Sequence, residues 1–213
     1  MIRSSVLTVC SGKSMHLMSK SKPTRDHIIE AADQLFYQQG YEHTSFADIA
    51  AAVKISRGNF YYHFKTKDDI LDAVIKLRLT NTQDMLEQWE IAGQSPAERI
   101  RHFINILITN QTKIMRYGCP VGTLSTELAK MDHSAKTDAS KLFTLFRTWL
   151  AQQFVSLGHV ADADDLAMHL LARSQGVATL ANAFRDENFI IQEVNKMDEW
   201  LKFYTKPAAS SSQ

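Results

Sequence analysis

Residues 44–67 read TSFADIAAAVKISRGNFYYHFKTK, and this stretch decides how the N-terminal part of the chain folds. Ser45-x-x-Asp48 is a capping-box pattern, in which a hydroxyl and a carboxylate satisfy free backbone N–H groups at a helix start. Ser56 is a favourable N-cap for a second helix a few residues later. The stretch therefore predicts two short helices joined by a tight turn, which is the arrangement of a helix-turn-helix.

The second helix of this pair is uniformly cationic. No acidic residue occurs between Lys54 and Lys67, whereas Arg57 and Lys65 add positive charge within the segment. A short cationic helix with small polar residues at its start can enter the major groove of DNA and be held there by phosphates. The pattern therefore favours DNA binding, although an aromatic run such as YYHF is also compatible with an ordinary core segment.

Each candidate DNA-contacting residue has a side chain suited to one part of the duplex. Hydroxyls at a helix N-terminus suit a phosphate, the Arg57 guanidinium can bind guanine O6 and N7, and Asn59 can reach an adenine edge. Gly58 allows a close backbone approach, and Lys67 adds a cation at the start of the next helix. The full predicted set is Thr44, Ser45, Ser56, Arg57, Gly58, Asn59, Tyr61, Tyr62, His63, Lys65, Thr66 and Lys67. The residues expected to pack beneath them are Ala47, Ile49, Ala50, Phe60 and Phe64.

A longer pattern around this stretch resembles the TetR family of transcriptional repressors. The resembling residues are Thr24 to Phe36, Gly40-Tyr41, Thr44-Ser45, Asp48-Ile49-Ala50, Ser56-Arg57-Gly58, Tyr61, Phe64 and Lys67. The resemblance implies a three-helix N-terminal DNA-binding domain, a larger helical C-terminal domain with a ligand pocket, and a homodimer that binds a pseudo-palindromic operator. The sequence departs from the family pattern at Lys54, where many relatives have glycine in the turn. A non-glycine residue can adopt that turn at modest cost.

Charge and cysteine content agree with this interpretation. Residues 1–78 carry 11 Lys or Arg and 8 Asp or Glu, an excess of +3, whereas residues 79–213 carry 13 and 15, an excess of −2. The basic excess therefore lies with the expected DNA-binding helices. Cys10 and Cys119 are too few for a disulfide scaffold and fit a reducing cytosol. No apolar run approaches the length of a membrane span, so we expect a cytoplasmic protein that acts on the nucleoid.

Helical periodicity and the Gly and Pro breaks predict an all-α chain of about nine helices. The expected helices cover 24–39, 45–52, 56–63, 66–92, 97–116, 120–130, 136–157, 162–184 and 187–204. We expect a flexible N-terminal extension at 1–22, the DNA-binding domain at 23–67, a helical regulatory and dimerisation domain at 68–205, and a disordered tail at 206–213. Met15 and Met18 are alternative start sites, so residues 1–17 are either an upstream extension or a disordered arm.

The C-terminal domain is rich in large apolar side chains, most of which must form its core. The resemblance implies a small, largely apolar effector in this domain, and the candidate residues for it are Phe103, Met115, Tyr117, Phe146, Trp149 and Cys119. Cys119 precedes Pro120, a favourable first helical residue, so its thiol is expected at a helix N-terminus. Gly-Cys at this place resembles a TetR subgroup whose cysteine responds to electrophiles or oxidants. Cys119 is therefore either a sensor thiol or a small packing residue.

A strip of small residues lies along the helix expected at 162–184, comprising Ala167, Ala172, Ser174, Gly176, Ala178, Ala181 and Ala183. Small residues allow helices to approach closely, so the last two helices, about 162–204, are the candidate homodimer face. Tight packing within one subunit is the alternative. The sequence shows no nucleophile elbow, Walker loop, dinucleotide fingerprint or zinc-ligand spacing. We therefore expect no catalytic residue, metal or cofactor, and the rival classes are a helical enzyme and a protein-interaction module.

Overall fold

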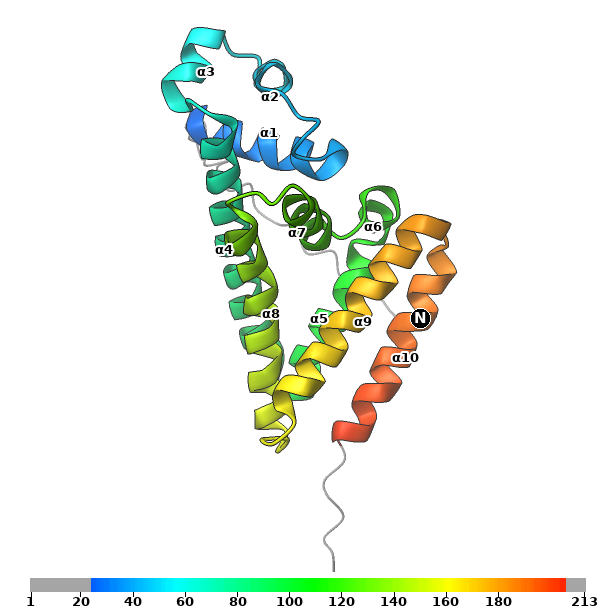
Figure 1. Cartoon of the computed structure of the whole chain (residues 1–213). Coiled ribbons are helices and arrows are strands. Elements are labelled where there is room, and N and C mark those ends of the chain that lie inside the picture. Colours follow the sequence, from blue (N-terminus) through cyan, green and yellow to red (C-terminus); the bar gives the residue numbers. More distant parts are fainter. Residues whose placement is uncertain (1–23, 206–213) are drawn as a thin grey trace, which may run out of the picture.

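The computed structural model of the chain describes residues 24–205, and these residues form helices joined by short turns, with no β-strand among them (Figure 1). The helices are α1 Thr24–Gln39, α2 Phe46–Val53, α3 Arg57–His63, α4 Lys67–Ala92, α5 Pro96–Thr109, α6 Gln111–Tyr117, α7 Pro120–Lys130, α8 Lys136–Ser156, α9 Ala163–Phe184 and α10 Glu187–Thr205. The all-α prediction is confirmed. The expected terminal segments at 1–22 and 206–213 lie outside the described residues.

The helix expected over 97–116 is divided in two at Asn110. This residue has φ −107° and ψ 11°, which is outside the helical region, and it ends α5 and precedes α6. Its side-chain amide donates a hydrogen bond to the Ile106 carbonyl at 3.0 Å. The Asn110 backbone amide donates to the same carbonyl at 3.0 Å, so backbone and side chain share it. Asn side chains commonly bond to the backbone at helix ends, and the apolar periodicity that continues through residue 110 does not show this break.

The head, which we define as α1–α3 and their turns at residues 24–66, is organised by local caps. Ser45 and Asp48 form a complete capping box at the start of α2, with the Asp48 carboxylate accepting from the Ser45 amide at 2.8 Å. Thr66 and Asp69 repeat the arrangement at the start of α4. Hydrogen bonds from Ser45 and Thr66 hold the pKa values of Asp48 and Asp69 below their usual range. Both predicted capping boxes are therefore confirmed.

Lys54 ends α2 in the left-handed conformation, with φ 55° and ψ 41°. Its backbone amide points back to the carbonyls of Ala50 and Ala51, so the residue closes the helix as a glycine C-cap would. A side chain with a Cβ disfavours this conformation by about 1–2 kcal/mol. The chain therefore makes the expected turn between α2 and α3 with a lysine in a conformation that favours glycine.

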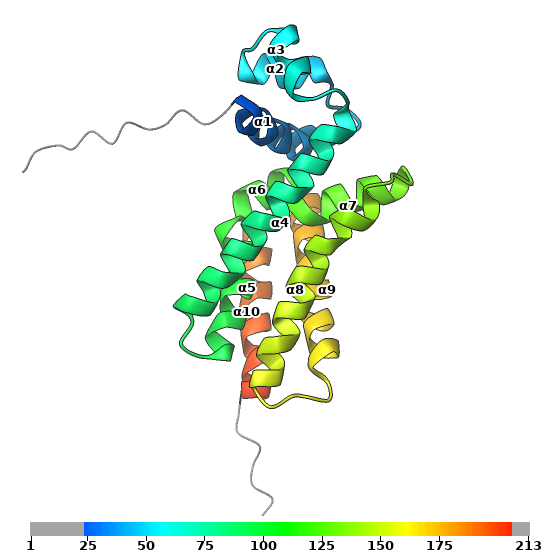
Figure 2. The same ribbon diagram turned by 90° about the vertical axis from the view of Figure 1, so that its left-hand side faces the viewer.

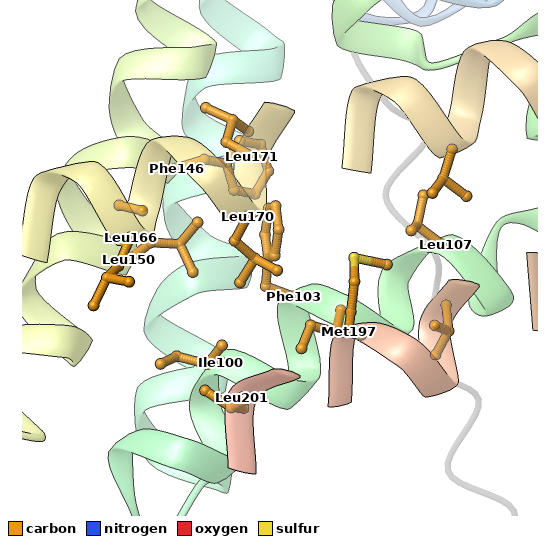
Figure 3. Close-up of a cluster of buried hydrophobic side chains, with 14 of the residues drawn as sticks. Ile100, Phe103, Leu107, Phe146, Leu150, Leu166, Leu170, Leu171, Met197 and Leu201 are labelled. Carbon is orange, nitrogen blue, oxygen red and sulfur yellow. The ribbon is translucent and has the colours of Figure 1, made fainter. Parts of the chain in front are cut away.

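The body, which we define as α4–α10 at residues 67–205, has its own apolar core. Figure 3 shows that side chains from α5, α8, α9 and α10 point toward one another there, including Phe103, Leu150, Leu170 and Met197. Each large side chain removed from water in this way stabilises the fold by about 1.5–3 kcal/mol. The four helices thus form a bundle that does not depend on the head for its core.

A second core joins the head to the body. Ile28 and Phe36 of α1, Ile49 of α2 and Phe60 of α3 are buried in it. Leu124 and Leu128 of α7 are buried in the same cluster, although they come from the expected regulatory domain. Figures 1 and 2 show the head at one end of the long helix α4, with α7 lying beneath α1. Packing therefore crosses the expected domain boundary through α7.

Polar contacts fix α7 to α1 at both of its ends. Before its first turn, the Tyr37 hydroxyl donates to the Gly118 carbonyl at 2.8 Å, and burial is the main reason that the pKa of Tyr37 rises to about 12. Arg78 of α4 donates to the Pro120 carbonyl at 2.6 Å. Near its last turn, the Glu127 carboxylate accepts from the amides of Tyr41 and Glu42, each at 2.9 Å. Helix α7 is thus held against the turn that joins α1 to α2.

Candidate nucleic-acid interface

Helix α3 carries an exposed row of polar and aromatic side chains at the far end of the head (Figure 1). Ser56 starts the helix as its N-cap, with its hydroxyl accepting from the Asn59 amide at 3.3 Å. Arg57, Gly58 and Asn59 are exposed in the first turn. A Cβ placed on Gly58 would meet no atom within 4 Å, so this first turn is open to another molecule.

The aromatic residues of α3 divide between core and surface. Phe60 is buried, and its ring lies 5.2 Å from that of Phe46 in an edge contact. Tyr61 packs on the same Phe46 ring at 5.6 Å but keeps 47% of its surface exposed, and Tyr62 is 78% exposed. The segment FYYHF, residues 60–64, therefore supplies core residues at positions 60 and 64 and projects both tyrosines from the protein.

The cations of the head differ in how freely their charged groups can reach a ligand. Within residues 24–205, no hydrogen bond or ion pair uses the exposed Arg57 guanidinium. The exposed Lys65 ammonium donates to the Tyr61 carbonyl at 2.5 Å. The half-buried Lys67 ammonium donates to the Tyr41 carbonyl at 2.9 Å and lies 4.2 Å from the centre of the Tyr41 ring. The Arg57 guanidinium is thus free to reach a ligand, whereas the Lys67 ammonium also fastens the α1–α2 turn.

Thr44 does not belong with the exposed candidates. Its side chain is completely buried, and its hydroxyl donates to the Gly40 carbonyl at 2.6 Å while accepting from the Gln39 amide at 3.2 Å. A buried hydroxyl with both roles filled cannot bind a phosphate. We therefore correct its assignment from DNA contact to closure of the α1–α2 turn.

The remaining predicted residues lie where a duplex could reach them. Ser45 and Thr66 are exposed caps, and their hydroxyls already serve the amides of Asp48 and Asp69. His63 is half-buried, with its ring 5.2 Å from that of Tyr62. These side chains form part of the surface around α3, and their contacts with DNA stay predictions.

The structure adds two residues to this surface that the sequence pattern did not single out. The Arg25 guanidinium lies 4.9 Å from the centre of the Phe64 ring, so a cation from α1 stands beside the end of α3. Ala47 was expected to be buried but is exposed, and with Arg57 and Tyr61 it lines a shallow hollow between α2 and α3. Arg25 is the second residue of the predicted first helix, and its positive charge there could have identified it as a candidate DNA contact.

The body contains a partly open cavity of about 80 Å³, placed among α5, α6, α7, α8 and α9. Three of the six predicted effector residues line it, namely Phe103, Phe146 and Cys119. The sequence interpretation missed the polar residues in its wall, which are Asn110, Ser174 and Gln175. None of the lining side chains is charged, so the cavity suits an apolar group accompanied by a hydrogen-bonding one.

The other three predicted effector residues do not line this cavity, and a role for them in effector binding stays a prediction. Trp149 is buried against Trp89 of α4, with ring centres 5.6 Å apart. Tyr117 packs against Tyr37 of α1 at 5.4 Å. Met115 is half-buried against the body core without lining the cavity. Tyr117 and Trp149 thus pack on aromatic residues of α1 and α4. The periodicity of the C-terminal domain alone could not identify these neighbours.

Cys119 occupies the expected place before Pro120, as the N-cap of α7. It is half-buried, and its Sγ accepts from the Gly122 amide at 3.4 Å. The thiol lies in the wall of the cavity and also in the wall of an open groove beside it. The Cys119 thiol could therefore respond to a molecule in the cavity. The same position also suits a cysteine that only packs against its neighbours.

The strip of small residues on α9 is split between two surfaces. Ala167, Ser174, Ala178 and Ala181 are buried within the protomer, as the alternative of internal packing required. Ala172, Gly176 and Ala183 are exposed, and they share α9 with the exposed apolar side chains of Met168, Leu180 and Phe184. Ile191 and Phe203 extend the exposed apolar character onto α10.

No helix within residues 24–205 combines the length and the apolar character needed to cross a bilayer. No group of three or more His, Cys, Asp or Glu side chains in this part of the chain is placed to hold a metal ion.

Comparison with known proteins identifies relatives along most of the chain. Residues 28–74 match the family model for bacterial regulatory proteins of the tetR family. Residues 96–195 match the model for the C-terminal domain of LmrA/YxaF-like transcriptional regulators.

Individual relatives agree with these matches. A helix-turn-helix transcriptional regulator in the lacX 3′ region of Lactococcus lactis is 29% identical over 171 residues, covering 78% of this chain and 87% of the relative. The transcriptional repressor DhaR of a Mycobacterium species is 27% identical and covers 72% of this chain and 80% of its own. A TetR transcriptional regulator from Legionella pneumophila has a similar solved structure, with a TM-score of 0.76 and 25% identity over 85% of this chain and 98% of that one.

Proposed function

Because the chain belongs to the TetR family of DNA-binding transcriptional regulators, we propose that it is a homodimeric repressor that leaves its operator when a small molecule binds the body. This class consists of regulators rather than enzymes. The proposed site of action is chromosomal DNA in the cytoplasm. The observation that carries the proposal is the exposed face of α3, where Arg57 projects from the first turn and Tyr62 from the last turn of a helix that has no acidic residue.

The proposed DNA contacts follow from that face. The first turn of α3 would enter the major groove, with Arg57 binding a guanine edge and Asn59 an adenine edge. Tyr61, Tyr62 and Lys65 would bind the flanking phosphates, because they are exposed on and just after α3. The Ser45 hydroxyl already donates to the Asp48 carboxylate and accepts from the Asp48 amide, so we assign it to the cap of α2. Arg25 is an additional phosphate partner at the end of α3.

A gel-shift titration with DNA from beside the gene tests this function. We expect saturable binding that survives an excess of unrelated DNA and weakens steeply with salt, because phosphate contacts release counterions. Binding that is equally strong to every duplex, or no binding, would contradict a repressor that recognises an operator.

The proposed homodimer uses the exposed apolar face of α9 and α10. Leu180 and Phe184 of α9 and Ile191 of α10 are the central residues of that face. Two copies paired about a two-fold axis would present two α3 helices to major grooves about 34–36 Å apart. Sedimentation of the wild type and of Leu180→Glu tests the interface, since a charge buried there should give monomers. A monomeric wild type would contradict the proposal.

Effector release is proposed to act through α7. Cys119 and Pro120 at the start of this helix line the cavity, whereas Leu128 and Glu127 near its end contact the head. A ligand that binds better when α7 is displaced would favour dimers in which the distance between the two heads does not match the operator. The affinity for the operator would then fall by mass action.

The alternative trigger is covalent modification of Cys119. Its thiol lies at the cavity wall, so an adduct would occupy the same space as a ligand. Operator affinity of wild type and Cys119→Ser, each with and without an electrophile, separates the two triggers. An unchanged response in Cys119→Ser would exclude the sensor thiol and leave the cavity ligand.

A further inference from the structure

An open groove of about 500 Å³ between α7 and α9 lies beside the cavity. Cys119, Phe143 and Gln175 belong to the walls of both spaces, so these side chains form the boundary between them. The Gln175 amide lies close over α7, since a Cβ on Gly122 would stand 2.5 Å from its Oε1. No hydrogen bond within residues 24–205 uses this amide, which leaves it available to a ligand at the boundary between the two spaces.

The two spaces differ in chemistry. The cavity wall has no charged side chain, whereas the groove contains Thr126, Thr179 and Asn182 together with the charged Glu127 and Lys130. Lys130 is exposed, and Glu127 is half-buried. A ligand that fills both spaces must therefore be apolar at one end and polar at the other.

The charge of Glu127 determines which charge the polar end of the ligand should carry. Its two oxygens accept from the amides of Tyr41 and Glu42, and no ion pair within the described residues neutralises its charge. An ionised carboxylate has about four acceptor sites, so capacity remains for another donor. A half-buried carboxylate without a cation favours a positively charged partner.

The length of such a partner follows from helix geometry. Cys119 at the boundary between the two spaces and Glu127 in the groove are separated by eight residues along α7, which corresponds to about 12 Å of helix rise. We propose that the effector is an elongated amphiphile whose apolar end fills the cavity and whose ammonium group binds Glu127. This inference rests on the proposed effector function of the cavity, and it specifies the chemical class of the ligand.

The same contact connects ligand and head. Glu127 fixes the turn at Gly40, where a Cβ would stand 3.0 Å from the Glu127 Oε1. An ammonium group that binds the remaining acceptor sites of this carboxylate draws its negative charge away from the amides of Tyr41 and Glu42. Binding in the groove therefore acts directly on the turn that precedes α2.

Three probes with one apolar body and different ends test the proposal by calorimetry on the full chain. They are 6-phenylhexylamine, 6-phenylhexanol and 6-phenylhexanoate. We expect the amine to bind about tenfold more tightly than the alcohol, because a hydrogen bond to a charged group is the stronger kind, and the carboxylate to bind most weakly. Glu127→Gln should remove the advantage of the amine and leave the affinity of the alcohol nearly unchanged.

Two further variants provide controls. Lys130→Ala removes the other charge of the groove and should preserve the order of the three probes. Phe143→Ala should weaken all three by a similar factor, because this residue lines the space for the apolar body. Thermal melting of each variant checks that it is folded.

Several results would overturn the proposal. Equal binding of amine and alcohol, tightest binding of the carboxylate, an amine preference that persists in Glu127→Gln, or binding of none of the probes would each do so. Operator binding without any probe is measured in parallel. If that binding fails while the amine preference is found, the DNA-binding proposal is wrong and the ligand class stands.

Discussion

The head and the body obtain their order in opposite ways. In the head, short helices are held by caps a few residues apart, such as Ser45 with Asp48 and Thr66 with Asp69. In the body, long helices are held by an apolar core assembled from distant segments (Figure 3). The head can therefore present an exposed helix in a fixed orientation, and the body can contain a cavity. Helix α7 contributes to both, since it lines the cavity and completes the core of the head.

The largest effects should come from truncating each core. Leu170 and Leu128 are both completely buried, the first in the body core and the second in the head core. Leu170→Ala and Leu128→Ala should each destabilise the protein by about 2–5 kcal/mol. Hydrogen exchange should locate the loss in α8 and α9 for Leu170→Ala and in α1–α3 for Leu128→Ala. Lowered protection confined to the body in Leu128→Ala would contradict the assignment of α7 to the head core.

The next effect concerns DNA and should not involve stability. Arg57→Ala should lower operator affinity by about 1–3 kcal/mol and relax discrimination at one base pair. Its melting temperature should stay at the wild-type value, because the side chain is exposed. Lys113→Ala, which removes an exposed cation of the body, is the matched control and should bind DNA as the wild type does. Equal losses in the two variants would show a general charge effect.

A smaller effect should come from the cap of α2. Ser45→Ala removes a hydroxyl that serves the Asp48 amide, and loss of such a cap costs about 1 kcal/mol. Urea denaturation followed by a probe in the head measures it. If Ser95→Ala at the start of α5, where the same type of cap occurs, affected the head as strongly, the effect would not be local.

Lys54→Gly should be a mild stabilisation. The residue has φ 55°, where glycine is unstrained, so the substitution should raise stability by up to about 1 kcal/mol. The same denaturation experiment measures the change. Arg185 ends α9 with φ 57° and offers the equivalent substitution in the body. Destabilisation by Lys54→Gly would mean that the lysine side chain contributes more than its backbone strain removes.

The smallest effect is a pH dependence of the head. The pKa values of Asp48 and Asp69 are lowered in the folded state by their capping hydrogen bonds. Their contribution to stability is therefore present at neutral pH and is lost as the pH falls through the folded pKa, below about 4. Hydrogen exchange of α2 between pH 3 and 6 should show this loss, and Asp48→Asn should show less of it. Protection that rises toward pH 3 would contradict the sign.

The sequence predicted local features of this fold well. The capping boxes, the turn at Lys54 and the helix starting at Pro120 depend on neighbouring residues, so their patterns could be recognised directly. The break at Asn110 escaped because apolar periodicity continues on both sides of it. The burial of Thr44 depends on the direction of the α1–α2 turn, which a motif does not specify.

The cavity was only partly predictable for a physical reason. Its wall combines residues from five helices, and composition cannot tell which face of each helix turns toward the others. Phe103 and Phe146 were found because large aromatic residues commonly line such spaces. Tyr117 and Trp149 share that property but pack on partners from α1 and α4. Gln175 was missed because a single amide on an amphipathic helix is usually exposed.

The central claim is that the exposed face of α2 and α3 binds DNA. Hydrogen exchange of the full chain, with and without a duplex from beside its gene, tests this claim directly. We predict that DNA slows exchange in residues 45–66, with the largest change in α3, and that exchange in α8 is unaffected. Protection that appears in α8 while residues 45–66 exchange as freely as before would contradict the account.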